Sequence, residues 1–250
     1  MKTLLLCAGY ATRLYPLTLN QPKHLLPVAG KPMIQYITDE LEKIEIIDEI
    51  YLVTNNKFYV MFDNWVKTLK TKKKLVVFND GTMEDGKKLG AIGDMDFVIQ
   101  QAKVNDDLLV IAGDNLFRHK LSDFIKFFKE KGTSVALYDV GNKELMKKYS
   151  EVRLDENKKL IYFQEKPQNP ETTLAAICMY LFPKNTLGMI RKYLNENNNP
   201  DQPGRYIQWL YQRQPVYGFV FTEKWYDIGD IQQYQEANKD YLLSFQEKRK

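Results

Sequence analysis

The stretch LCAGYATRLYPL (residues 6–17) passes from an apolar run into a glycine and then places Thr12 and Arg13 close behind it. Backbone N–H groups in such a turn can surround phosphate oxygens, and an arginine can hold them with two parallel hydrogen bonds. The dinucleotide pattern G-x-G-x-x-G is not met, because Ala11 and Leu14 stand at glycine positions, and the Walker pattern is absent too. The residues alone leave two interpretations open: a phosphate-binding turn, or an ordinary strand-to-helix turn with an exposed arginine.

A second candidate group is Lys23, in the stretch PKHLLPVAGKPM (residues 22–33). The prolines of this stretch stiffen the backbone around the lysine. A lysine held on a rigid loop near Arg13 can neutralise a second phosphate charge, and an ordinary solvated lysine is the alternative. We expect the neighbouring His24 to pack rather than to react.

These groups need a scaffold, and the first 140 residues alternate strand-like and helix-like patterns. The patterns predict strands at 2–8, 49–55, 75–78, 107–114 and 134–140, and helices at 32–44, 90–102 and 121–132, the last with Gly132 as its C-cap. This alternation predicts a parallel sheet with helices on both faces. The carboxyl ends of parallel strands share one edge of a sheet, and ligands bind there.

The pattern changes in residues 141–250. It predicts a hairpin that turns at 156–159, an apolar strand at 174–182, a strand that ends in the turn of WYDIGD (residues 225–230), and a closing helix. We therefore predict a single domain with two halves, 1–140 and 141–250. The fold class is α/β, a Rossmann-like and mostly parallel mixed sheet, in which the second half extends the sheet and covers its ligand edge.

Several stretches together resemble, in order, the motifs of the sugar nucleotidyltransferase family: residues 6–36, KKLGAIGD, LLVIAGDN, FQEKP and WYDIGD. The resemblance covers nearly the whole chain and includes no hexapeptide β-helix of the kind that some members append. It implies transfer of a nucleotidyl group from a nucleoside triphosphate to a sugar 1-phosphate, with release of pyrophosphate. Both reactants are anions, so such a site must neutralise charge and hold the geometry of an in-line attack.

On the nucleotide side, the resemblance gives Arg13 the β- and γ-phosphates and Lys23 the α-phosphate, and it makes both residues catalytic together with Asp114. The same resemblance places Thr12 in the nucleotide-binding turn and brings the backbone of Ala8 and Gly9 close to the nucleoside. Gly90 is expected to start a helix and to let the base approach the main chain.

Two carboxylates form the expected metal site. Asp114 ends the predicted strand at 107–114, and the resemblance brings Asp227 to the same edge. Two carboxylates, phosphate oxygens and water suit Mg²⁺. The alternatives are a helix N-cap for Asp114 and a turn carboxylate for Asp227, and we expect Asp230 to N-cap the last helix.

On the acceptor side, the resemblance implies that Lys166 meets the sugar phosphate and that Glu165 accepts hydrogen bonds from sugar hydroxyls. An ion pair on the surface is the alternative. Ser150 and Cys178 stand where many relatives carry a glycine that faces the sugar, so we expect both side chains to narrow the acceptor pocket. The loop at 79–88 is either a flap or an ordinary loop.

The bulk properties exclude some classes of partner. A net charge of +4 gives no argument for nucleic acid, and no apolar run approaches the ~18 residues of a membrane span. Cys7 and Cys178 lie in apolar runs typical of buried free thiols, and the chain starts with a strand rather than a signal peptide, so we expect a cytoplasmic protein. The lysine-rich segment 67–74 is expected to be a solvated helix end.

The expected function is transfer from UTP or dTTP to a hexose 1-phosphate, glucose or N-acetylglucosamine 1-phosphate, with Mg²⁺ as cofactor and self-association left open. One alternative is cytidylyl transfer to a smaller phosphorylated alcohol, which a narrowed pocket allows. Another is a regulatory protein that binds a nucleotide sugar without turnover. An enzyme is favoured because Arg13, Lys23, Asp114, Lys166 and Asp227 are all present, and a dehydrogenase is excluded by the missing glycine fingerprint.

Overall fold

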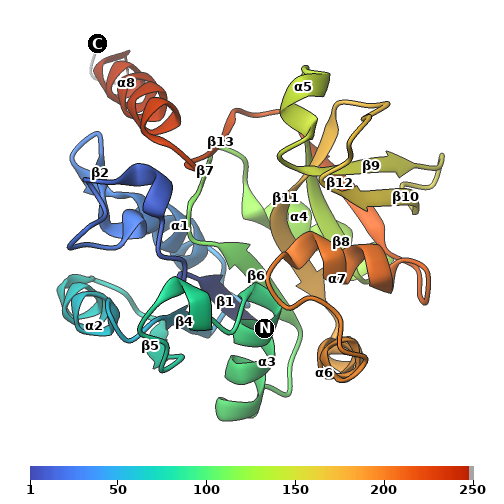
Figure 1. Cartoon of the computed structure of the whole chain (residues 1–250), viewed down its shortest axis with the longest axis horizontal. Helices are drawn as coiled ribbons and strands as arrows, with labels where there is room; N and C mark the ends of the chain where they lie inside the picture. The colour runs from blue at the N-terminus through green and yellow to red at the C-terminus, as the bar shows by residue number, and fades with distance from the viewer. Residues whose placement is uncertain (248–250) are drawn as a thin grey trace.

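The computed structural model describes residues 1–247, without the side chains of Phe245 and Glu247. Within these residues a nine-stranded sheet runs in the order β10-β9-β11-β6-β1-β4-β5, with β8 paired to β11 and β12 paired to β8 (Figure 1). Its strands are β1 Lys2–Leu6, β4 Glu49–Thr54, β5 Lys74–Asn79, β6 Leu108–Ala112, β8 Ser134–Asp139, β9 Ser150–Leu154, β10 Leu160–Glu165, β11 Leu174–Phe182 and β12 Tyr217–Phe221.

Two small ribbons complete the strands: β2 Pro27–Val28 pairs with β3 Lys31–Pro32, and β7 Asn115–Phe117 pairs with β13 Trp225–Asp227. The helices are α1 Met33–Glu42, α2 Tyr59–Thr68, α3 Ala91–Gln101, α4 Leu121–Lys131, α5 Lys143–Met146, α6 Gly188–Asn195, α7 Pro203–Leu210 and α8 Ile231–Glu247. The short strand β13 and the helices α2, α5, α6 and α7 are not among the predicted elements.

The predicted parallel sheet with helices on both faces is confirmed by β6, β1, β4 and β5, which pair in parallel. Side chains of β1 alternate between the two faces. Leu4 and Leu6 join the apolar cluster under α3, α6 and α7, while Leu5 and Cys7 join the cluster under α1, α2 and α4. Both faces of the sheet are therefore buried, and its carboxyl-end edge is the place left for a ligand.

The second half extends this sheet, as predicted, through the long strand β11. This strand is antiparallel to β6, β8 and β9, and its register shifts between Ala176 and Tyr180. Cys178 lies in that shift with a φ of 50°, in the left-handed region. One difference from the prediction concerns β8, which pairs with β11 and β12 rather than with the parallel strands, because β11 occupies the place beside β6.

The predicted helix ends agree with the structure. Gly132 has a φ of 89°, and its N–H donates to the carbonyl of Phe128 at 2.8 Å, which ends α4. The Asp230 carboxylate accepts from the backbone N–H of Gln233 at 2.9 Å and so caps the start of α8. Cys7 is a buried free thiol, and Cys178 is a half-buried free thiol.

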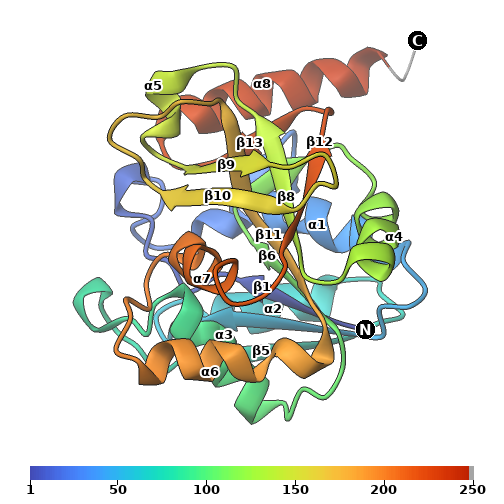
Figure 2. The same cartoon turned by 90° about the vertical axis from the view of Figure 1, so that its right-hand side faces the viewer.

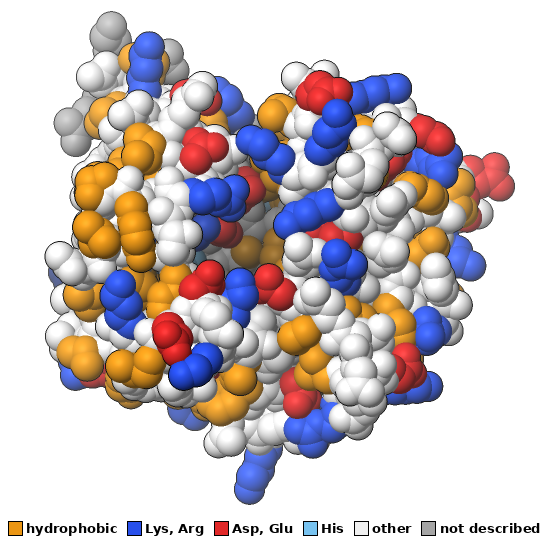
Figure 3. Space-filling model, viewed as in Figure 1, with side chains coloured by type: hydrophobic (Ala, Val, Ile, Leu, Met, Phe, Trp, Pro, Cys, Tyr) orange, Lys and Arg blue, Asp and Glu red, His pale blue; other side chains and the backbone are white. Residues whose placement is uncertain are grey.

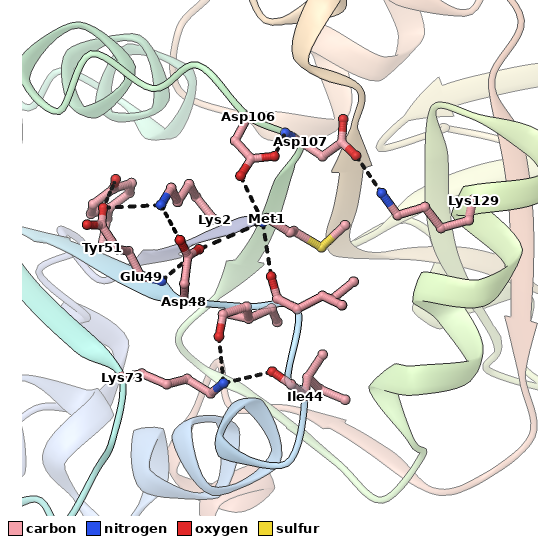
Figure 4. A network of polar contacts seen from close by, with 12 residues as sticks. Met1, Lys2, Ile44, Asp48, Glu49, Tyr51, Lys73, Asp106, Asp107 and Lys129 are labelled. Atoms are coloured by element: carbon pink, nitrogen blue, oxygen red, sulfur yellow. Dashed lines mark hydrogen bonds and ion pairs between the residues drawn. The ribbon is translucent and has the colours of Figure 1, made fainter.

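Polar contacts hold the amino ends of the parallel strands (Figure 4). The Met1 ammonium lies 2.8 Å from the Asp106 carboxylate, just before β6. Lys73, from the lysine-rich segment, donates to the carbonyls of Ile44 and Ile47 at 2.7 and 2.6 Å. That segment is therefore only partly a solvated helix end, because this lysine ties the entry to β5 to the end of α1.

The two halves of the chain contact each other in two places. Helix α8 packs on the first half, where Asn238 accepts from the Ala29 N–H at 2.7 Å (Figure 2). At the start of α3, the Ile92 N–H donates to the carbonyl of Pro200 at 2.8 Å. Within the described part of the chain, no helix has the length and apolarity that crossing a membrane requires.

The contact with Pro200 explains why position 90 is a glycine. Gly90 has a φ of 80°, and a Cβ there would lie 2.6 Å from the Pro200 carbonyl oxygen. Gly81 also has a φ of 80°, but a Cβ on that residue would have nothing within 4 Å. The two glycines therefore share a positive φ and differ in crowding.

We predict that Gly90→Ala lowers the free energy of unfolding by about 2–4 kcal/mol, since it adds a clash to the cost of an alanine at positive φ. Gly81→Ala, the matched control, should cost only about 1 kcal/mol. Urea denaturation of both variants measures the difference. Equal losses would show that the contact between α3 and Pro200 adds nothing to stability.

Candidate active site

A cavity of about 430 Å³ opens at the carboxyl ends of the parallel strands. Figure 3 shows the hollow in the middle of this face, with Lys and Arg side chains on both of its walls. Both halves of the chain line it, and it brings together most of the predicted site residues, namely Ala8, Gly9, Thr12, Arg13, Lys23, Gly90, Asp114, Cys178 and Asp227.

The turn after β1 is shaped by local hydrogen bonds. Ala11 has a φ of 51°, and its carbonyl accepts from the Thr18 hydroxyl at 2.8 Å. A single 3₁₀ turn, Thr12–Leu14, follows, and Arg13 is exposed on it. The Asn55 side-chain amide donates to the carbonyl of Ala8 at 2.9 Å. The turn thus presents a fixed backbone and a guanidinium at the cavity, an arrangement suited to an anion.

The ammonium of Lys23 donates to the Asp114 carboxylate and, at 3.2 Å, to the carbonyl of Ile228. Both side chains are largely buried, with 12% and 21% of their surfaces exposed. Burial alone would raise the pKa of Asp114, but the charge of Lys23 and its hydrogen bond, together with His24 and a backbone hydrogen bond, hold that pKa below its usual value. The pair therefore holds the Lys23 side chain at one position in the cavity wall.

Asp227 is the second carboxylate of the predicted metal pair. The pairing of β7 with β13 sets Asp227 opposite Asn115, the residue after Asp114. Burial and the negative charge of Asp114 raise the pKa of Asp227 to about 6, against the opposing effects of Lys23 and Arg13. Two close carboxylates with excess negative charge fit a hard divalent cation that takes its remaining ligands from phosphate and water.

No cluster of three or more metal-ligating side chains occurs within residues 1–247. The predicted donor set is the pair Asp114 and Asp227, and Mg²⁺ commonly binds between one or two carboxylates and substrate phosphates rather than in a cage of protein ligands. The metal assignment stays a prediction on this basis.

Gly90 lines the cavity and precedes α3, as expected, but its missing side chain makes room for Pro200 of the second half. The loop at 79–88 contributes Asp85 and Lys88 to the cavity wall. Lys88 pairs with Asp201 at 3.1 Å, so this loop is tied to the second half rather than free.

Of the predicted acceptor residues, the structure brings only Cys178 into the wall of the cavity. Ser150 is buried, and its hydroxyl donates to the Glu165 carboxylate rather than facing the cavity. Lys166 is exposed with a φ of 49° at the end of β10. Ser150, Glu165 and Lys166 are therefore not among the lining residues, while Cys178 is. The roles of the first three in binding an acceptor stay predictions.

Sequence reasoning missed the aromatic wall of the cavity. Trp225 donates its indole N–H to Asn115 at 2.8 Å, and Tyr149 packs edge-on against it with ring centroids 5.4 Å apart. Burial and the charge of Asp227 raise the pKa of Tyr149 to about 12. His24 lines the cavity but is buried, and its ring packs beside Phe62 as predicted. The aromatic residues in the motif WYDIGD were the signal available for this wall.

Comparison with known proteins identifies the family. The nucleotidyl transferase family model matches residues 2–244, and the chain belongs to that family. The chain is 32% identical over 243 residues to the bifunctional protein GlmU of Methanocaldococcus jannaschii, covering 97% of this chain and 54% of that protein. It is 30% identical over 243 residues to a protein of Sulfolobus acidocaldarius provisionally named a mannose-1-phosphate guanyltransferase, covering 97% of this chain and 63% of that one.

A crystal structure of a UDP-glucose pyrophosphorylase complexed with UDP-glucose has the same fold, with a TM-score of 0.82 and 22% identity. It aligns with 97% of this chain and 98% of its own chain. The chain spans about half the length of the GlmU relative. The names of these relatives differ in base and sugar, so family membership alone does not assign the substrates.

The pair of Lys23 and Asp114 gives a test of the site that needs no substrate. We predict that Lys23→Met lowers the free energy of unfolding by about 2–4 kcal/mol, because it leaves a buried carboxylate without its cation. The double variant Lys23→Met/Asp114→Asn should recover most of that loss.

The matched control is Lys67→Met, since Lys67 forms an exposed pair with Asp63 one helical turn earlier, with 68% and 40% of the side chains exposed. This change should stay within about 0.5 kcal/mol of wild type. Chemical denaturation measures all three variants. A double variant no more stable than Lys23→Met would contradict a coupled pair.

Proposed function

We propose that this protein transfers a nucleotidyl group from a nucleoside triphosphate to a sugar 1-phosphate and releases pyrophosphate. The observation that carries the proposal is the meeting of Arg13, Lys23, Asp114 and Asp227 in one cavity at the sheet edge. Two cations suit the triphosphate and two carboxylates suit a divalent cation bound with it. Membership of the nucleotidyl transferase family supports the same reaction.

In the proposed reaction, a phosphate oxygen of the acceptor attacks the α-phosphorus, a P–O bond forms, and the bond to the β-phosphate breaks. Pyrophosphate leaves with the electron pair of that bond. The attacking phosphate is already ionised near neutral pH, so the chain needs no general base. Catalysis then consists of holding the reactants in line and neutralising charge.

Each charged side chain has a part in this scheme. Arg13, exposed on the turn after β1, holds the β- and γ-phosphates. Lys23 binds the α-phosphate and the charge that develops on it, and Asp114 orients its ammonium through their ion pair. Asp114 and Asp227 would hold Mg²⁺. A bound Mg²⁺ supplies further charge neutralisation at the reacting phosphates.

The proposed substrates are UTP or dTTP and glucose or N-acetylglucosamine 1-phosphate. The structural likeness to a UDP-glucose pyrophosphorylase supports this choice of starting point. Because the Cys178 side chain lines the cavity, a smaller phosphorylated alcohol is the alternative acceptor. The deciding experiment is a screen for pyrophosphate release, with the common triphosphates against a set of sugar 1-phosphates and phosphorylated alcohols. The cytoplasm is the proposed compartment.

We predict that pyrophosphate release stops when a chelator removes divalent cations and returns with Mg²⁺. Asp114→Asn should lower kcat by about a hundredfold or more, since it removes a charge at the reacting phosphates. A coupled pyrophosphate assay reports both effects. Full turnover in chelator would exclude the proposed metal site, and no turnover with any substrate pair would exclude the reaction.

We predict that removing Arg13 and removing Lys166 affect different substrates. Arg13→Ala should lower kcat/KM with every triphosphate, whereas Lys166→Ala should chiefly raise KM for the sugar phosphate, each by roughly 1.5–3 kcal/mol. Lys158→Ala is the matched control, because Lys158 is also exposed with a positive φ, of 67°, at the turn of the same hairpin. If Lys166→Ala behaves like Lys158→Ala, the lysine at the end of β10 has no part in binding the acceptor.

A further inference from the structure

One acidic side chain in the cavity has no place in the mechanism above. Asp94 lies on α3, one helical turn after Gly90, and lines the cavity. Only 4% of its surface is exposed, and its Oδ1 atom is buried with no hydrogen-bond partner within residues 1–247. Its neighbour Asp96, by contrast, pairs with Arg191 at 2.9 Å.

The surroundings of Asp94 favour its neutral form. Burial, followed by the negative charges of Asp80 and Asp201, raises the pKa of Asp94 to about 8. Of the two lysines that line the cavity, Lys88 is engaged by Asp85 and Asp201, and Lys23 by Asp114. At pH 7 most molecules therefore carry a neutral carboxyl group at this position, which can donate one hydrogen bond and accept others.

A buried carboxyl group without a hydrogen-bond partner lowers the stability of the folded protein. A buried polar atom without a partner loses its hydrogen bonds to water and gains none in return. The lining residues from the central strands, Leu6 and Ala112, offer only apolar side chains. A carboxyl group kept at that cost within a cavity indicates a partner on the ligand, because no described side chain supplies one.

We propose that Asp94 determines substrate specificity by hydrogen-bonding a hydroxyl group on a sugar ring of the bound substrates. The proposal rests on the proposed function, in which both substrates carry such rings: the ribose of the triphosphate and the sugar of the acceptor. A hydroxyl donates and accepts at one atom, as the neutral carboxyl of Asp94 does. A phosphate group is disfavoured here, because Asp80 and Asp201 bring negative charge.

The test compares Asp94→Asn and Asp94→Ala with the control Asp96→Asn on the same helix. Loss of the hydrogen bond should raise KM for one substrate by about tenfold in Asp94→Ala, with kcat nearly unchanged. The melting temperature of the protein without substrates should stay equal or rise, since an unsatisfied buried group is removed. Asp96→Asn should leave both KM values unchanged.

The two sources of the hydroxyl are separated with deoxy substrates. If Asp94 binds the ribose, Asp94→Ala raises KM for the triphosphate and no longer distinguishes it from its 2′- or 3′-deoxy analogue. If Asp94 binds the acceptor, KM rises for the sugar phosphate, and a deoxy sugar phosphate loses its disadvantage in the variant. Either result supports the proposal.

Unchanged KM values for both substrates in both variants would overturn the proposal, whatever the melting temperatures. A lower melting temperature with unchanged KM values would show that the carboxyl group serves the fold alone. The stabilisation of wild type and Asp94→Ala by each substrate alone, measured as the shift in melting temperature, gives a readout without turnover. A wild type that binds substrates but makes no pyrophosphate contradicts the proposed function, while equal shifts in both proteins contradict the role of Asp94.

Discussion

The ion pair between Lys23 and Asp114 is the contact on which the site depends. It joins the loop after β1 to the end of β6, and the pairing of these two strands, Leu6 opposite Ala112, makes the contact geometrically available. The same ammonium reaches the carbonyl of Ile228, so the segment before α8 is drawn to the same point. One buried cation thus holds three distant parts of the chain at the edge of the sheet.

The acidic side chains near Lys23 determine how much stability the folded protein loses at the site. Lys23 satisfies Asp114, but the buried Asp94 and the partly buried Asp227 have raised pKa values and no ion-pair partner among the described residues. Buried acids in this condition weaken the folded state. The cavity is therefore a region where stability is given up for binding capacity, and the apolar clusters on the two faces of the sheet supply the stability that it lacks.

The sequence predicted the parallel strands and the first loops well, because apolar alternation and motif order are local signals. Arg13 follows the predicted strand at 2–8 and Asp114 ends the one at 107–114, so their meeting at one edge needed only the rule for parallel sheets. Lys23 lies on the loop beyond Arg13, and its role came from the family resemblance. Ser150 was predicted to face the cavity and instead binds Glu165, since the face of a strand depends on register that a sequence does not display. Gly90 was assigned to the base, yet its partner, Pro200, is 110 positions away.

The two sides of the cavity differ in how the strands beneath them pair within the sheet. The proposed triphosphate side is built at the ends of β1, which pairs in parallel on both edges, and of β6, which pairs with β1 and β11. The positions of its charged groups therefore follow from the sheet itself. The proposed acceptor side is built on β9 and β10. Strand β9 pairs with β11 at two positions, next to the register shift at Cys178, and the β9–β10 hairpin is also bridged to β12 between Lys159 and Tyr217. Fewer residue pairs therefore fix β9 to β11 than fix β1, which has five pairs on each of its edges.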